Sequence, residues 1–380
     1  CPVGASCTNI INANPQLGLL ADNGGHTKTM ALGSGSSAID AGGVNSVCVA
    51  TDQRGLRRPQ GAACDNGAYE DAHGSVLHAM PNGSTTGECD SWENACELSY
   101  VLAIAFSGHE IWAAAGTYKP IAGSDRTATF QLAAGVFVYG GFAGTETSRD
   151  QRNPTINLTI LSGDIDNNDS QTPVITDLTS VTGNTTNSHH VVTGADGATL
   201  DGFNITAGYA YGSTSDGGGM YISSGNQTLE NVTFSGNSAS DRGGGIYCSS
   251  ANLALMNVNF TGNLAHGYGG GVALVSTAGD SPSLTNVTFT GNSAGYYGGG
   301  LYNIYSSPIL TNVTFNNNSA LSNGGGGISN FYSNPTLKNV TFNGNWTNFL
   351  GGGMYNTSGS PTLTNTTFRG NSAGYYGGGL

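Results

Sequence analysis

One sequence unit recurs every 26 to 29 residues from Ile205 to the last residue of the chain. Each copy has an apolar stretch that ends in the pattern F-x-x-N, then a turn, then a run of glycines followed by an apolar residue. Ile205 stands at the aromatic position of the first copy, and the later copies have Phe234, Phe260, Phe289, Phe315, Phe342 and Phe368. Self-similarity at a fixed period of this length is typical of solenoid proteins.

A second fixed position lies three residues after each phenylalanine and holds Asn237, Asn263, Asn292, Asn318, Asn345 and Asn371. The stretches before it are rich in Val, Thr and Phe, which suit a half-buried pleated strand. A helical solenoid is disfavoured, because a glycine triplet in each period would cost on the order of 1 kcal/mol per glycine in a helix. The repeat therefore predicts an all-β fold, a parallel β-helix solenoid.

In such a solenoid, equivalent residues of successive coils lie about 4.8 Å apart. We therefore expect the phenylalanines to stack inside the coil and the asparagines to form a hydrogen-bonded ladder. We expect a right-handed coil, although the pattern by itself does not determine the hand.

The repeats of residues 199–380 resemble those of chlamydial polymorphic outer-membrane proteins and of many bacterial surface β-helix proteins. Residues 1–70 resemble a different part of such proteins, the closing region that precedes a choice of cell-surface anchors. The segments that carry this second resemblance are Asn14–Gly25, Ser37–Gly42, Thr51–Gly55 and Cys64–Glu70. The resemblance implies a β-helix and a surface location, and it implies nothing about activity.

Four segments follow from these patterns. Residues 1–70 are predicted to close a preceding β-helix unit, and residues 71–90 to form a linker with a turn at Pro81–Ser84. Residues 91–198 are predicted to hold the irregular first coils, with strands at 111–114 and 136–139. They begin with an amphipathic helix from Ser91 to Ser107 that caps the apolar end of the solenoid. Residues 199–380 form the regular repeats.

Composition agrees with an extracellular, cell-surface location. The net charge is −13 and only 9% of the residues are charged, so the chain should repel nucleic acid and anionic membranes. No stretch reaches the ~20 apolar residues of a membrane span, and no signal peptide opens the sequence. Because the sequence stops inside a repeat, at Gly377–Leu380, we expect either a segment of a longer precursor or an end that another copy covers.

The seven cysteines favour an oxidising compartment. Six of them are near neighbours in sequence: Cys1 and Cys7, Cys48 and Cys64, and Cys89 and Cys96. We expect disulfides within the last two pairs in particular, although spacing alone does not prove a connectivity. Cys248 is left single, and we expect it to be a small buried hydrophobe.

One acidic segment is a candidate calcium site. Oxygen-bearing side chains alternate at Asp164, Asp166 and Asn168, with Asp169 next to them, and hard cations prefer such ligands. The segment lacks the glycine and the closing glutamate of a complete calcium loop, so a plain solvated loop is the competing interpretation. His189 and His190 should point to opposite faces of an extended segment, which favours a structural role for both.

Catalysis by a β-helix that cleaves polysaccharide needs clustered carboxylates, or a carboxylate-bound calcium with a basic residue. From residue 199 onward the charged residues are few and do not recur at a common place in the repeat. The adjacent pair Asp241–Arg242 is most simply a solvated turn. We therefore expect no enzymatic activity. The alternative is a polysaccharide-degrading enzyme with its active site outside this sequence or around Asp164, which a groove with two carboxylates within about 10 Å would favour.

Tyrosines follow several glycine runs, at Tyr221, Tyr247, Tyr302 and Tyr355. Such rows can stack on sugar rings or on each other along the solenoid, and we favour mutual stacking. The many N-x-S/T triplets are explained more simply as ladder positions than as glycosylation sites. The pattern as a whole predicts a structural or adhesive surface protein, a filament or sheath subunit that associates head to tail with copies of itself. Cell-surface polysaccharide is a second candidate partner.

Overall fold

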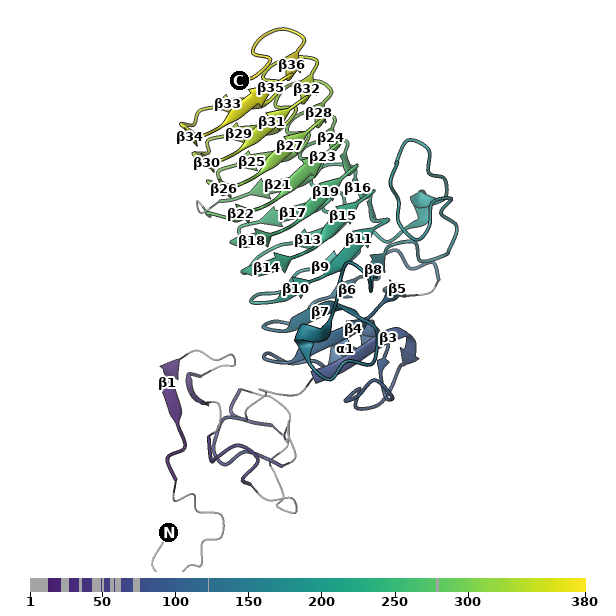
Figure 1. The fold of residues 1–380 in the computed structure, drawn as a ribbon, viewed down its shortest axis with the longest axis vertical. Coiled ribbons are helices and arrows are strands. Elements are labelled where there is room, and N and C mark those ends of the chain that lie inside the picture. Colours follow the sequence, from purple (N-terminus) through teal and green to yellow (C-terminus); the bar gives the residue numbers. More distant parts are fainter. Residues whose placement is uncertain are drawn as a thin grey trace, which may run out of the picture.

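The computed structural model describes residues 13–21, 27–33, 36–42, 49, 51–54, 58, 63–70, 76–121, 123–277 and 280–380. Within these residues α1 (Leu98–Ile104) is the one α-helix, accompanied by two short 3-10 turns, η1 (Arg149–Gln151) and η2 (Asn184–Thr186). From residue 76 onward the strands wind into a parallel β-solenoid of about ten turns, whose coils follow one another along the long axis in Figure 1. The predicted fold class is confirmed, and the hand of the coil stays a prediction.

Each regular turn contributes one strand to each of four parallel sheets, which we number I to IV. Sheet I contains β3 (Val76–Ser84), β4 (Glu110–Ala114), β7 (Phe137–Phe142), β10 (Thr199–Asp201), β14 (Gln227–Glu230), β18 (Leu253–Met256), β22 (Ser283–Thr285), β26 (Ile309–Thr311), β30 (Thr336–Lys338) and β34 (Thr362–Thr364). Sheet II contains β5 (Gly116–Tyr118), β8 (Thr159–Ser162), β11 (Phe203–Thr206), β15 (Thr233–Ser235), β19 (Asn259–Thr261), β23 (Thr288–Thr290), β27 (Thr314–Asn316), β31 (Thr341–Asn343) and β35 (Thr367–Arg369).

The other two sheets are shorter. Sheet III contains β6 (Phe130–Gln131), β9 (Val192–Thr193), β13 (Met220–Ile222), β17 (Ile246–Ser249), β21 (Val272–Val275), β25 (Leu301–Ile304), β29 (Ile328–Phe331) and β33 (Met354–Thr357). Sheet IV consists of two-residue strands: β12 (Tyr209–Ala210), β16 (Ser238–Ala239), β20 (Leu264–Ala265), β24 (Ser293–Ala294), β28 (Ser319–Ala320), β32 (Trp346–Thr347) and β36 (Ser372–Ala373). The chain visits sheets II, IV, III and I in each regular turn.

The phenylalanines of the repeat form one continuous stack in the core. Five of the six rings are fully buried, and Phe368 of the last turn is partly buried. Successive ring centroids lie 4.7 to 5.1 Å apart with interplanar angles of 3° to 9°. Ile205 pairs with Phe234 in the strand register and begins the column. The expected stack is confirmed.

The glycine run is explained by close packing between turns. In the triplet Gly298–Gly300, the first glycine has a φ of +68°, a left-handed conformation that glycine adopts at no steric cost. A Cβ on Gly300 would lie 2.8 Å from the ring of Phe315 in the next turn. The glycine run therefore makes the room that the phenylalanine stack occupies.

The predicted asparagine ladder is also present, and its members are buried until the last turn. The side chain of Asn292 donates to the carbonyl oxygen of Phe260 at 2.9 Å and to Oδ1 of Asn318 at 2.9 Å. Its own Oδ1 accepts from the backbone N–H and from Nδ2 of Asn263. Each asparagine thus joins its turn to both neighbouring turns.

Replacing Asn292 by leucine should destabilise the solenoid, because buried groups of the neighbouring turns lose their partner at about 1–3 kcal/mol each. Thermal unfolding followed by circular dichroism would measure the effect. The control is Thr288→Ala in the adjacent strand, whose side chain is only half-buried. Equal shifts in Tm for the two variants would contradict the ladder's role.

The first turns differ from two sequence predictions. Residues 76–84, predicted as part of a linker, form β3, which pairs in parallel with β4 and buries Leu77, His78 and Ala79. The linker prediction is wrong here because this strand is buried against the first turn. Pro81 is tolerated because a strand at the end of a sheet does not need every N–H.

The capping helix is present but shorter than predicted. The expected helix from Ser91 to Ser107 is reduced to α1, because Glu97 and Ala105 at its two ends are extended. The disulfide between Cys89 and Cys96 holds the chain just before it. Leu98, Val101 and Leu102 of α1 belong to the same buried cluster as the phenylalanine stack. The helix therefore covers the apolar end of the core, as predicted.

The described part of residues 13–70 contains little apolar core. Strands β1 (Leu17–Ala21) and β2 (Thr29–Leu32) pair antiparallel, and only Leu32, Ala38 and Tyr69 form a buried apolar cluster among the described residues of this segment. Among the described residues, polar groups take the place of a larger apolar core.

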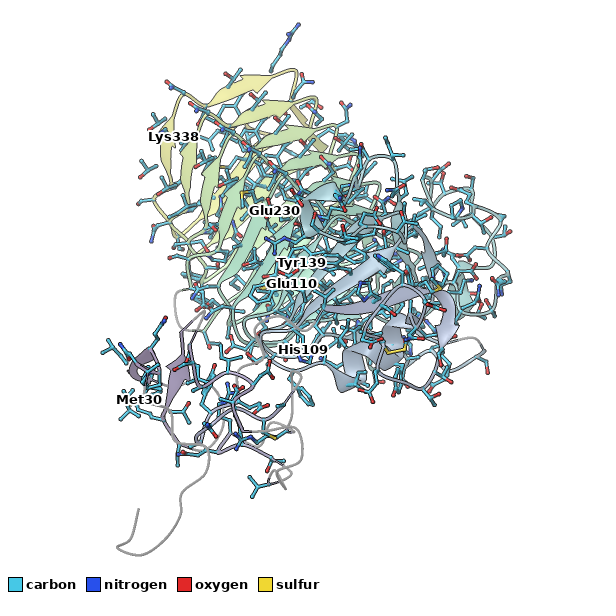
Figure 2. The ribbon with its side chains drawn as sticks, turned by 60° about the horizontal axis from the view of Figure 1, so that its bottom comes forward. Met30, His109, Glu110, Tyr139, Glu230 and Lys338 are labelled. Atoms are coloured by element: carbon cyan, nitrogen blue, oxygen red, sulfur yellow. A yellow bond between two sulfur atoms is a disulfide. The ribbon has the colours of Figure 1, made fainter. Side chains whose placement is uncertain are left out.

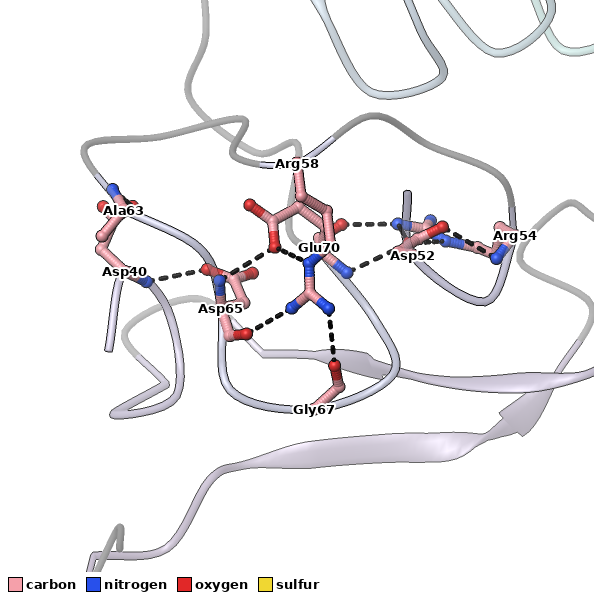
Figure 3. A network of polar contacts seen from close by, with 8 residues as sticks. All are labelled: Asp40, Asp52, Arg54, Arg58, Ala63, Asp65, Gly67 and Glu70. Carbon is pink, nitrogen blue, oxygen red and sulfur yellow. Dashed lines mark hydrogen bonds and ion pairs between the residues drawn. The ribbon is translucent and has the colours of Figure 1, made fainter. Parts of the chain in front are cut away.

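A buried ionic network connects the motifs that the sequence analysis singled out in this segment (Figure 3). Arg58 Nε donates to Glu70 Oε2 at 2.8 Å, and Arg54 Nε donates to Asp52 Oδ2 at 2.8 Å. Both carboxylates have fully buried side chains. The N–H of Asp65 donates to Glu70 Oε2, and the N–H of Glu70 donates to Asp52 Oδ2. The two ion pairs thus hold three separate stretches of chain together.

Candidate functional site

A cleft of about 620 Å³ lies where the first turns meet the loop that follows β8. One wall comes from β3, the start of α1 and the end of β5, and the other comes from the segment 162–173. The residues that line it include the polar side chains of Glu97, Lys119, Asp164, Asn167, Asp169 and Gln171. This is the part of the described chain where the sequence placed its calcium and enzyme alternatives.

Lys119 is the basic group of the cleft, and its ammonium group is fully hydrogen-bonded to the loop that follows β8. Its ammonium group contacts the carbonyl oxygen of Asp164, Asp164 Oδ2 at 3.2 Å and Asn167 Oδ1 at 2.7 Å. An ammonium group has three N–H donors, so each donor has a partner. Lys119 therefore fastens the loop to the end of β5.

The four predicted calcium ligands lie in this one loop, and each is engaged with protein groups. Asp164 Oδ1 accepts from the N–H of Asn168, and Asp166 Oδ2 accepts from Asn168 Nδ2 at 2.8 Å. Asp169 Oδ2 accepts from Asn187 Nδ2 at 2.8 Å. In the described ranges, no group of three His, Cys, Asp or Glu residues has an arrangement that could hold a metal ion. Calcium binding stays a prediction.

If calcium binds, it should stabilise only this irregular segment, and chelation should make residues 160–190 more sensitive to protease. The test is limited proteolysis with and without chelator, with the cleavage sites identified by mass spectrometry. The regular repeats serve as the internal control. An unchanged cleavage pattern would support the plain-loop interpretation.

Burial raises the pKa of Asp169 to about 6, and repulsion from Asp164 and Asp166 acts in the same direction. The hydrogen bond from Asn187 and the charge of Lys119 oppose the shift. Asp169 thus differs from an ordinary surface carboxylate. The cleft combines a lysine with three carboxylates, those of Glu97, Asp164 and Asp169. Lys119 and Asp164 are paired with each other, and Asp169 is bound to Asn187. Glu97, the third carboxylate of the cleft, is exposed.

One arginine of the regular turns is paired with two carboxylates. Arg242 lies between Asp216 of the preceding turn, at 3.1 Å, and Asp241, at 3.2 Å, and its guanidinium lies over the ring of Tyr247. The prediction of a solvated turn at 241–242 is therefore too simple, because the arginine is half-buried. It joins two turns in the same way as the ladders do.

The tyrosines stack on each other, as favoured from the sequence. Tyr221 and Tyr247 are stacked at 5.5 Å. In the next turn, this position of sheet III holds Ala273, which pairs with Tyr302 of the turn after it. There the ring of Tyr268, which lies just before β21, packs against the ring of Tyr302 with centroids 5.0 Å apart. Tyr247 and Tyr302 are mostly buried. Rings packed in this way leave little of their faces free for sugars.

The structure describes some of the cysteines for which disulfides were predicted, together with Cys248. The disulfide Cys89–Cys96 is confirmed. Cys64 is also disulfide-bonded, whereas Cys1, Cys7 and Cys48 lie outside the described residues. Cys248 is buried and free, and burial raises the pKa of its thiol to about 12.

His190 has a structural role. Its Nδ1 lies 2.9 Å from the carbonyl oxygen of Gly217, and its ring stacks on Tyr221 at 4.9 Å. Burial lowers its pKa, which keeps the ring neutral at physiological pH.

Two further ladders are present, and only the first of them was expected from the sequence. The asparagines of the N-x-S/T-like triplets lie at exposed turns with positive φ: Asn231, Asn257, Asn286, Asn312, Asn339 and Asn365. From Asn257 on, each donates to the one before it at 3.0 to 3.2 Å, and Asn231 donates to Asp201 at 2.9 Å. Their spacing in the repeat gave the signal, and the prediction that these triplets hold ladder positions is confirmed. A third ladder, Asn303–Asn330–Asn356, lies in sheet III at the positions that Cys248 and Leu274 hold in earlier turns. Its start within an apolar column left no such signal.

An aromatic cluster covers the outer face of the first strands of sheet I. Trp112 and Phe142 are stacked at 4.8 Å, and His78 meets Trp92 edge-on at 4.5 Å. Glu110 and Tyr139 lie close together (Figure 2), and Arg149 Nη1 binds both side chains. These strands are thus buried on both faces, and the cluster is part of the scaffold.

Comparison with known proteins identifies the repeat. Residues 231–249 and 286–304 match the Chlamydia polymorphic membrane protein repeat. Each match runs from an exposed asparagine through the phenylalanine and the glycine triplet to the end of the strand in sheet III. No curated protein matches the chain. The resemblance of residues 1–70 to an anchor-preceding region stays a prediction.

A solved structure, the crystal structure of pectate lyase Pel9A, is 12% identical to this chain. The match covers 77% of this chain and 78% of that one with a TM-score of 0.36. This likeness indicates nothing about activity. No helix in the described part of the chain is long and apolar enough to span a membrane.

Proposed function

We propose that this chain is a non-enzymatic structural or adhesive protein of a bacterial cell surface. The observation that supports it is the match to the polymorphic membrane protein repeat. The matched residues belong to turns whose asparagines form hydrogen-bonded ladders with the neighbouring turns. A rigid solenoid held in this way can present a long surface outside the cell. The anionic net charge and the presence of a disulfide agree with an extracellular location.

The state of the cleft supports the non-enzymatic part of the proposal. Its lysine and the carboxylates of Asp164 and Asp169 are bound to partners within the protein. A general acid or base must reach the proton that it transfers. Purified protein should therefore release no reducing ends or unsaturated products from neutral or acidic polysaccharides. Cleavage that is lost in Lys119→Ala would overturn this part and favour the enzyme alternative.

We further propose that the protein forms filaments or a sheath through its residues 1–70. The support is an apolar surface there, with Leu17, Leu19, Leu20 and Met30 all exposed, since such patches commonly mark contact sites. A copy of the same chain is the proposed partner, and surface polysaccharide is the second candidate.

Surface labelling and electron microscopy test these proposals separately. Antibody should label intact cells, and protease added outside the cells should remove the label. Labelling only after the cells are opened would exclude a surface role. The purified chain should form fibres in negative stain. Fibres of unchanged axial repeat from a chain without residues 1–70 would contradict association through that segment, with the variant Leu19→Asp as a milder test.

A further inference from the structure

Two tyrosines form an exposed, stacked pair at the corner where the chain leaves sheet III. Tyr305 directly follows β25 and Tyr332 directly follows β29, two strands that pair in parallel with Ile304 opposite Phe331. The ring centroids of the two tyrosines lie 5.0 Å apart, and the interplanar angle is 13°. Tyr305 is 49% exposed and Tyr332 is 53% exposed. The pair is therefore open to reagents in solution, unlike the mostly buried tyrosines of the sheet.

The backbone holds the two side chains in neighbouring turns. The N–H of Tyr305 donates to the carbonyl oxygen of Phe331 at 3.0 Å. Tyr305 and Tyr332 have left-handed φ angles of +53° and +49°, which are uncommon for bulky side chains. The turns on either side have Ser276 and Ser358 at the equivalent position, directly after β21 and β33. The tyrosine pair is thus flanked by small side chains at this corner.

The pair is also separate from the other aromatic side chains. Among the described residues, the one ring contact of each of these two tyrosines is with the other. The exposed Tyr296 differs, because its ring meets Tyr268 at 40° and Tyr268 in turn contacts Tyr297 and Tyr302. A radical formed on either member of the corner pair therefore has a single aromatic neighbour with which to react.

We propose that Tyr305 and Tyr332 are a site of oxidative cross-linking, at which a peroxidase acting with hydrogen peroxide joins the two rings as dityrosine. Each phenol loses one electron and one proton, and one molecule of hydrogen peroxide is reduced to two molecules of water. The two phenoxyl radicals then couple through a new bond between their ortho carbon atoms. The hydrogen atoms on these carbons move to the phenol oxygens, so the product is the native chain less two hydrogen atoms.

The geometry and the surroundings of the pair suit this reaction. The separation of the ring centroids is only slightly larger than the contact distance of about 3.5–4.0 Å between carbon atoms. Exposed side chains change rotamer within nanoseconds, so the rings can turn until their ortho carbons meet. The disulfide between Cys89 and Cys96 agrees with an oxidising compartment. The cross-link joins two neighbouring turns covalently at a corner where their backbones are already hydrogen-bonded.

Oxidation of the purified full chain tests the proposal. Peroxidase and hydrogen peroxide are added to a mixture of isotope-labelled and unlabelled chains, and dityrosine is followed by its fluorescence and by mass spectrometry of proteolytic peptides. We expect one main cross-linked product, in which the peptides that contain Tyr305 and Tyr332 are joined with the loss of two hydrogen atoms. Both halves of each joined product should have the same label, because the bond forms within one molecule.

Three variants show whether this pair is the site. Tyr305→Phe and Tyr332→Phe keep the ring but cannot form a phenoxyl radical, so each should lose the joined peptides and most of the dityrosine fluorescence. The control is Tyr296→Phe, which removes a phenol from a ring that is 47% exposed and should cross-link like the native chain. The proposal is overturned if the native chain forms no dityrosine between these two residues or if its joined peptides have mixed labels. Native fluorescence in Tyr305→Phe would overturn it as well.

Discussion

Replacing Phe289 by alanine is expected to lower the free energy of unfolding by about 3–5 kcal/mol, the typical cost of removing a large buried aromatic side chain. The ring is fully buried between Phe260 and Phe315, with centroid distances of 4.9 and 4.7 Å. Its loss leaves a cavity that the glycine-lined wall beside it cannot fill, because the glycines have no side chains. Two turns lose a stacking partner at once.

Urea unfolding followed by far-ultraviolet circular dichroism measures the effect. It appears either as a lower urea concentration at the midpoint or as an additional transition at low urea concentration. A solenoid can lose cooperativity between its turns, so exchange of the flanking turns should be measured as well. The matched control is Phe349→Ala, whose ring is 40% exposed. A comparable loss of stability in both variants would mean that the central column does not hold the turns together.

Replacing Arg58 by alanine should unfold much of residues 13–70 while leaving the solenoid intact. Its guanidinium binds Glu70 Oε2 and the carbonyl oxygens of Asp65 and Gly67. Removal of one partner from a buried ion pair costs about 3–5 kcal/mol, since the other charge stays buried and unpaired. The small apolar cluster of this segment has little stability in reserve.

Limited proteolysis is a direct measurement, because cleavage within residues 13–70 should become rapid while cleavage of the repeats stays slow. Lys28→Ala is the control, as Lys28 is exposed in the same segment. A double variant with apolar residues of similar size at 58 and 70 should recover much of the resistance. Resistance of Arg58→Ala equal to that of the native chain would show that the ion pair is dispensable.

The repeated half of the molecule was predictable down to single side chains. The same residue types lie one turn above and one turn below Phe289, Asn292 and Gly300. The period of the sequence therefore shows which residues are in contact. Because the local pattern repeats six times, the tertiary contacts of each copy are made with the equivalent residues of its neighbouring copies. For this reason the core stack, the inner ladder and the capping role of the helix followed from the sequence.

The structure of the irregular half depends on contacts between residues that no repeat in the sequence relates to each other. The sequence predicts a linker where β3 lies, because only its pairing with β4 identifies it as a strand. The helix is shorter than predicted because the chain is extended at Glu97 and Ala105. Lys119 and Asp164 are 45 residues apart, and Asp169 and Asn187 are 18 apart, with no repeat to connect them. Only the tertiary structure brings these groups together, because side chains from unlike segments meet there through packing of the whole chain and not through a register that the sequence repeats.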